Sequence, residues 1–131
     1  MAGETALDVA KRAWDCWVAA DLDGFIALWE PDGVWTNSGH SQISGPRQGH
    51  DAIADVARAV FEISGGTFKA YPLELAASGD DVVLGYFHME AERPGASLDQ
   101  NALQRMLIRD GKLVALDNVF SDEAAMDAFF A

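Results

Sequence analysis

The chain has 131 residues, half of them hydrophobic, and its 21 acidic and 9 basic residues give a formal net charge of −12. This length and apolar content predict a single domain over residues 1–131, with a core that needs neither a disulfide nor a metal ion. The negative charge argues against nucleic acid and membrane surfaces as partners, and the absence of a basic-then-apolar leader or a membrane-length apolar run predicts a cytoplasmic protein.

Three helices and one strand are predicted in the first half of the chain. Apolar residues recur every three or four positions in the helical segments, which is the spacing of one helix face. Asp23 is placed to cap the short second helix, and Gly65-Gly66 ends the third. The helices are predicted over residues 5–20, around 25–29 and over 51–64, and the strand around 34–36.

The second half of the chain changes from the helical period to strict alternation, which is the pattern of strands. Asp110-Gly111 is a dipeptide typical of tight hairpins, and Ser121 to Glu123 introduces a short final helix. The four strands are predicted over residues 67–77, 82–92, 99–109 and 112–120.

This order of elements predicts an α+β fold. Three helices cannot cover both faces of a five-stranded sheet, so we expect a strongly curved, mostly antiparallel sheet with three to four helices packed inside it. The strands are long enough to enclose a cavity at the open end of such a cone.

Three motifs carry a resemblance to a known family. They are W-x-x-D-x-x-W from Trp29 to Trp35, S-G-P-R-Q-G-H-D-A-I from Ser44 to Ile53, and D-G-K-L-V-A-L-D-N-V-F from Asp110 to Phe120. Together with the element order, they resemble the SnoaL-like branch of the nuclear-transport-factor-2-like superfamily. Ketosteroid isomerase, limonene epoxide hydrolase, scytalone dehydratase and polyketide cyclases belong to that superfamily, so the fold alone does not specify an activity.

The resemblance implies which positions to examine for acid/base groups. Asn37 matches the rim-strand position where the isomerases carry an aspartate and the epoxide hydrolases a water-holding asparagine. Phe87 and Met89 match the inward positions that carry arginine and aspartate in the hydrolases, and Asn118 matches a position that is often acidic. An amide cannot abstract a proton near neutral pH, although it can bind water or a carbonyl group.

Aromatic and amide residues are the candidates for a ligand pocket. Four tryptophans are many for so short a chain, and an indole ring combines a flat apolar surface with one N–H donor. Gln104 faces inward if the alternating set of Ala102, Met106 and Ile108 does. The expected pocket residues are Trp14, Trp17, Trp29, Trp35, Phe61, Phe87, Met89, Gln104, Met106 and Asn118.

The candidate catalytic residues are Asn37, His40 and His88. His40 lies in the rim loop, and His88 would point into the pocket only if its strand slipped by one residue. No group of residues has metal-ligand spacing and no glycine-rich loop has phosphate-binding form, so we expect neither metal nor cofactor. The single cysteine, Cys16, is expected to be a buried structural thiol.

Two functions are compatible with these residues. One is a pocket protein for a small, apolar, oxygenated molecule of polyketide, steroid or terpenoid type, with cofactor-free isomerase, cyclase, dehydratase or hydratase chemistry. The other is a non-catalytic binding or assembly module. An ionisable side chain inside the cavity would favour the enzyme. A homodimer is expected in either case, because Leu84, Tyr86 and Leu103 would otherwise form an exposed apolar patch.

Overall fold

The computed structural model describes residues 4–131. In chain order, its elements are α1 (Ala6–Val18), α2 (Leu22–Ala27), β1 (Trp29–Asn37), β2 (Gly45–Gln48), α3 (His50–Ile63), β3 (Lys69–Ser78), β4 (Val82–Arg93), β5 (Ala96–Arg109), β6 (Lys112–Phe120) and α4 (Glu123–Phe129). No helix in this part of the chain is long and apolar enough to cross a membrane.

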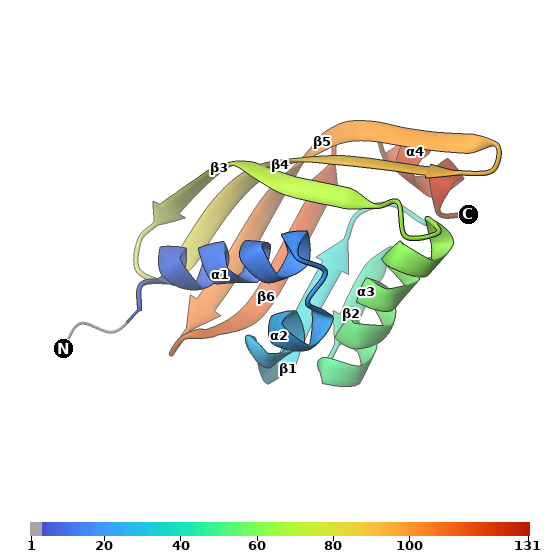
Figure 1. The fold of residues 1–131 in the computed structure, drawn as a ribbon. Helices are drawn as coiled ribbons and strands as arrows, with labels where there is room; N and C mark the ends of the chain where they lie inside the picture. The colour runs from blue at the N-terminus through green and yellow to red at the C-terminus, as the bar shows by residue number, and fades with distance from the viewer. Residues whose placement is uncertain (1–3) are drawn as a thin grey trace.

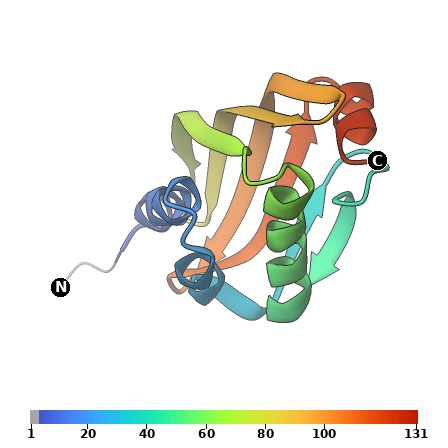
Figure 2. The same ribbon diagram turned by 45° about the vertical axis from the view of Figure 1, so that its right-hand side comes forward.

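All six strands form one sheet in the order β2-β1-β6-β5-β4-β3. Every neighbouring pair is antiparallel except β1 and β6, which run parallel. The sheet is strongly curved, and α1, α2 and α3 lie on its concave side (Figures 1 and 2). The predicted α+β class and curved, mostly antiparallel sheet are therefore confirmed.

Side-chain caps fix where the first two helices begin. At α1, the Thr5 hydroxyl accepts a hydrogen bond from the Asp8 amide at 3.1 Å, and the Asp8 carboxylate accepts one from the Thr5 amide at 3.1 Å. Such a reciprocal pair satisfies two otherwise free N–H groups. At α2 the cap is Asp21, which accepts from the Gly24 amide at 3.0 Å. The prediction of Asp23 as the cap was wrong, because the helix begins at Leu22 and the residue before it, Asp21, is the cap.

The sheet has one strand more than predicted. The additional strand, β2, covers only Gly45 to Gln48 and pairs with the end of β1, where Thr36 lies opposite Pro46. Its glycine and proline hide it from a search for alternating residues, and proline is tolerated here because β2 is an edge strand. The neighbouring strand β1 already begins at Trp29, with a register shift before Val34.

The register of β4 decides which side chains face the core. Phe87 and Met89 are 4% and 1% exposed, whereas Leu84 and Tyr86 lie on the convex face at 48% and 39%. The expected inward orientation of Phe87 and Met89 is confirmed, and the slipped register that would turn His88 inward does not occur. The core thus fills the space between the concave face and the helices.

Candidate functional site

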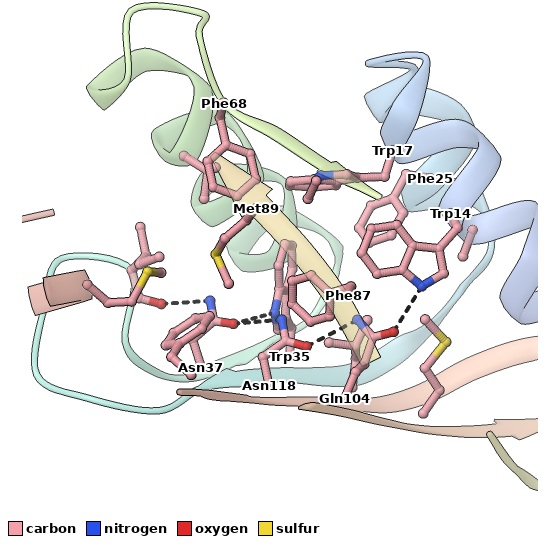
Figure 3. Close-up of a pocket in the computed structure, with 18 residues that line it drawn as sticks. Trp14, Trp17, Phe25, Trp35, Asn37, Phe68, Phe87, Met89, Gln104 and Asn118 are labelled. Carbon is pink, nitrogen blue, oxygen red and sulfur yellow. Dashed lines mark hydrogen bonds between the residues drawn. The ribbon is translucent and has the colours of Figure 1, made fainter. Parts of the chain in front are cut away.

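A cavity lies within this core, between the concave face of the sheet and helices α1 and α3 (Figure 3). Its volume is about 50 Å3, which is room for a few water molecules at about 10–15 Å3 each. All of its lining residues are apolar or aromatic except three amides, Asn37, Gln104 and Asn118. The polar chemistry of the cavity therefore resides in these three side chains.

The three amides form a directed chain of hydrogen bonds. Trp14 Nε1 donates to Gln104 Oε1 at 3.0 Å, and Gln104 Nε2 donates to Asn118 Oδ1 at 3.1 Å. Asn118 Nδ2 donates to Asn37 Oδ1 at 3.0 Å, and Asn37 Nδ2 donates to the Ile43 carbonyl at 3.0 Å. The dashed lines in Figure 3 trace this chain across the cavity. A fully connected network of this kind holds each side chain in one orientation.

Strand pairing places the amides in one row. Asn37 is paired with Asn118 across β1 and β6, and Asn118 is paired with Gln104 across β6 and β5. Side chains directly opposite each other on adjacent strands lie on the same face of the sheet. The row ends at Gly85 on β4, where an added Cβ would lie 3.3 Å from Gln104 Oε1. The glycine thus leaves room for the Gln104 amide.

The amides keep hydrogen-bonding capacity for a guest molecule. An amide oxygen can accept two hydrogen bonds and an amide nitrogen can donate two. Asn37 Oδ1 uses both of its positions, because it also accepts from Trp35 Nε1 at 2.9 Å. Within this network, Gln104 and Asn118 each use one acceptor position and one N–H. Each of these two side chains therefore retains one unused donor position and one unused acceptor position within the network.

No ionisable side chain is found among the cavity-lining residues, all of which belong to the described part of the chain. Amide and indole groups neither take up nor release protons near neutral pH. The arrangement can orient a neutral polar group by hydrogen bonds but supplies no general acid or base. A charged group would be buried there without an opposite charge, at a large desolvation cost.

An aromatic wall faces the amides across the cavity. The Trp17 ring contacts Phe68 edge-on at a centroid distance of 6.1 Å and Phe61 at 5.1 Å. Figure 3 shows Trp17 and Phe68 on the side away from Asn118 and Gln104. On the other side of this wall lies a wider groove of about 640 Å3, which shares Trp17, Phe68 and Ala70 with the cavity. The wall therefore separates a small cavity with a polar floor from an open groove, whose lining is mainly apolar but includes Arg58, Glu62 and Lys69.

The structure places the expected pocket residues in two groups. Those at the cavity are Trp14, Trp17, Trp35, Phe87, Met89, Gln104, Met106 and Asn118, together with Asn37. Two others lie elsewhere. Phe61 lines the groove. Trp29 is 1% exposed, but its ring lies against Gly33, whose added Cβ would come within 2.5 Å of it. Trp29 belongs to the core beside the cavity, where its ring packs edge-on against Phe25 at a centroid distance of 6.1 Å.

Neither candidate catalytic histidine reaches the cavity. The His40 side chain is 94% exposed, with Nδ1 3.9 Å from Asp127 Oδ2. His88 lies on the convex face, where its Nδ1 is 2.6 Å from Asn101 Oδ1. The hydrogen bond to Asn101 is the main cause that raises the pKa of His88. The hydrogen bond to Glu90 and the negative charges of Asp99 and Glu90 raise it further, whereas burial lowers it. His88 therefore cannot exchange a proton with a molecule in the cavity, because it lies on the opposite face of the sheet.

Several cavity residues were not anticipated from the sequence. Phe25, Phe68 and Met126 complete the lining from α2, the segment before β3 and α4. Phe25 lies in the short helix predicted around residues 25–29, and its ring packs edge-on against Trp35 at a centroid distance of 5.7 Å. Helical periodicity shows that such residues are buried. It does not show which part of the core they face.

The cone-shaped sheet, the enclosed helices and the internal cavity define a protein of the nuclear-transport-factor-2-like fold, as in solved structures of that superfamily. Residues 10–116 match the model of the SnoaL-like domain. The chain therefore belongs to the SnoaL-like family.

Three proteins are similar to this chain over nearly its whole length. The structure of Bal32a, from a soil-derived mobile gene cassette, is 27% identical, covers 96% of each chain and superposes with a TM-score of 0.91. A cystatin-like-fold protein of unknown function from Xanthomonas campestris is 26% identical, with a TM-score of 0.92 over 98% of this chain and 99% of its own. The Mycobacterium tuberculosis protein Rv0034 is 22% identical over the full length of both chains. These relationships establish the fold and family without assigning a reaction.

Proposed function

We propose that the protein binds a small, uncharged, mostly apolar molecule and holds one carbonyl or hydroxyl oxygen of it against Gln104 and Asn118. The observation that carries this proposal is the row of buried amides, which keeps free donors and acceptors in an otherwise apolar cavity. Pockets that bind small molecules typically combine apolar walls with a few fixed polar groups. The proposed role is binding without acid/base catalysis by the cavity residues.

The size of the cavity narrows the expected ligand. A volume of about 50 Å3 admits only the oxygen-bearing end of a molecule. The remainder would occupy the groove once Trp17 and Phe68, which form the wall between the two spaces, move apart. A single ring or a short terpenoid or polyketide fragment fits this description better than a fused steroid. The net charge of −12 further disfavours anionic ligands.

Tryptophan fluorescence provides a direct test, because Trp14, Trp17 and Trp35 all line the cavity. The protein is titrated with benzyl alcohol, benzoate and benzylammonium, which share a ring and differ in the charge of the head group. The proposal predicts saturable quenching by benzyl alcohol and at least tenfold weaker binding of both ions. Preferred binding of benzoate or benzylammonium would contradict it.

The variant Gln104→Leu separates the amide contact from apolar burial. Leucine has nearly the same size as the glutamine side chain but offers no hydrogen bond. Removing one neutral hydrogen bond costs about 0.5–1.5 kcal/mol, so benzyl alcohol is expected to bind several-fold more weakly. Toluene, which lacks the hydroxyl group, should bind the variant and the unmodified protein equally. Equal weakening for both probes would indicate damage to the cavity instead of loss of a polar contact.

We also propose that the protein forms a homodimer through the convex face of the sheet. Leu84, Leu103 and Val119 are 48%, 59% and 54% exposed there. Apolar side chains grouped on one face are typical of an interface between protein chains. Light scattering at micromolar concentration should give twice the chain mass of 14.1 kDa. The variant Leu103→Lys should shift the mass toward that of one chain, and a monomeric unmodified protein would refute the proposal.

A further inference from the structure

The convex face of the sheet carries a second polar site, opposite the cavity. His88 and Glu90 lie two residues apart on β4 and therefore on the same face, and Asp99 on β5 is paired with Glu90. His88 Nε2 lies 3.3 Å from Glu90 Oε2 and 3.1 Å from Asp99 Oδ1. One ligand atom from each of the three side chains lies within 4.8 Å of the others.

A neighbouring amide determines how the His88 ring is oriented. Asn101 Nδ2 donates to the Tyr86 hydroxyl at 2.8 Å, which turns Asn101 Oδ1 toward His88 Nδ1 at 2.6 Å. An amide oxygen only accepts hydrogen bonds, so Nδ1 must carry a proton. Nε2 donates to Glu90 Oε2 at 3.3 Å and lies 3.1 Å from Asp99 Oδ1, so a metal ion bound there would take the place of the Nε2 proton. One donor atom from each of the three side chains is therefore available to the same ion, within 4.8 Å of the other two.

This arrangement has the features of a metal-binding histidine. Such histidines almost always donate their other ring N–H to an oxygen atom, which fixes the tautomer and the ring orientation. Zn2+ binds histidine nitrogen and carboxylate oxygen at about 2.0–2.2 Å in tetrahedral sites, so adjacent ligand atoms are about 3.3–3.5 Å apart. The 3.3 Å and 3.1 Å distances from His88 Nε2 are close to this separation.

We propose that His88, Glu90 and Asp99 form a Zn2+ site on the convex face of the sheet, with the fourth coordination position open to water. In a single chain, the side chains of His88, Glu90 and Asp99 are 19%, 51% and 76% exposed, so an ion can reach all three from solvent. Along β4 and β5 these residues follow the Tyr86–Leu103 pair of the proposed dimer contact, so the site requires that contact to leave this end of the two strands open. The mixed nitrogen and oxygen donors favour Zn2+ over the oxygen-binding ions Ca2+ and Mg2+. The site is independent of the ligand cavity.

Isothermal titration of the tag-free, EDTA-treated protein with ZnCl2 tests the proposal. One saturable site per chain is expected, together with a visible absorption band of tetrahedral type when Co2+ replaces Zn2+. His88→Gln and Asp99→Asn should each weaken binding at least tenfold. Asn101→Leu should weaken it by about 10–100-fold through loss of the ring orientation, as for other residues that orient metal ligands.

His40→Gln is the matched control, because His40 also lies near a carboxylate but has no second one beside it among the described residues. This variant should bind Zn2+ as the unmodified protein does. Asp99 is largely exposed, so Asp99→Asn should retain the urea unfolding midpoint of the unmodified metal-free protein. Non-saturating Zn2+ binding, or equal binding by His88→Gln, would overturn the proposal. It would leave a protonated His88 paired with Glu90 as the explanation of the cluster.

Discussion

The substitution Asn118→Asp places a carboxyl group at the centre of the amide row and exchanges only NH2 for an oxygen atom. Asn118 is 8% exposed, and its Nδ2 donates to Asn37 Oδ1 at 3.0 Å. A protonated carboxyl can replace both bonds, since its O–H donates to Asn37 and its carbonyl accepts from Gln104. An ionised carboxylate would place its negative charge next to the Asn37 oxygen, which also carries partial negative charge, in apolar surroundings. The variant should therefore fold well only while this group holds its proton.

The size of the effect follows from burial. A fully buried carboxyl has its pKa raised by as much as about 3–5 units, and each unit corresponds to 1.36 kcal/mol. A folded-state pKa above the unfolded value means that the folded protein binds the additional proton, so stability falls as pH rises between the two values. For a rise of about three units, the variant loses about 4 kcal/mol between pH 4 and pH 8 relative to the unmodified protein.

Urea unfolding at half-unit steps of pH measures this difference directly. Gln48→Glu is the matched control, because it makes the same amide-to-carboxyl change at an exposed position of the same sheet. Its stability difference from the unmodified protein should vary little with pH. A pH-independent difference for Asn118→Asp, or one no larger than that of Gln48→Glu, would refute the description of the cavity as a site that excludes charge.

Three further predictions concern other parts of the molecule. Hydrogen bonds from Thr5 lower the pKa of Asp8, so Asp8→Asn should reduce the stability of the folded protein near pH 7. The stability difference between the variant and the unmodified protein should vanish as pH falls through the lowered pKa, and a difference that persists in acid would contradict this. Burial raises the pKa of Cys16, and the negative charges of Asp21 and Asp15 add to this effect. Iodoacetamide at pH 8 should therefore react more slowly with the folded protein than with glutathione, and the two reaction rates should become similar when urea unfolds the protein. Gly85→Ala, whose Cβ would lie 3.1 Å from Leu75 and 3.3 Å from Gln104, should cost about 1–3 kcal/mol in urea unfolding, and a neutral result would show that the amide row tolerates displacement.

Much of the fold could be predicted because local patterns and the global fold agree. The family resemblance correctly placed Phe87 and Met89 inside, and Asp110-Gly111 marked the turn between β5 and β6. The short strand β2 was missed because an edge strand of four residues with glycine and proline carries no alternation. The Asp21 cap was missed because Asp23 is an equally good capping residue two positions later.

The candidate site was less predictable because its geometry depends on pairing between distant strands. Asn37, Gln104 and Asn118 could each be identified as a polar residue in an inward position, but their hydrogen-bonded row requires the register of β1, β6 and β5. The same limit applies to the convex face. The H-x-E pattern of His88 and Glu90 is visible in the sequence, whereas Asp99 joins it only through the register of β4 and β5. Spacing along the chain therefore gave no sign of a metal site.

Methyl NMR of methionine-labelled protein tests the central claim most directly, because Met89, Met106 and Met126 all line the cavity. Titration with benzyl alcohol should shift the resonances of these three methyl groups along one saturable curve. Benzoate should leave them in place at the same concentrations. Shifts that benzoate produces equally, or benzyl alcohol binding that leaves all three methyl groups unchanged, would contradict the account of a cavity that binds neutral ligands on its amide row.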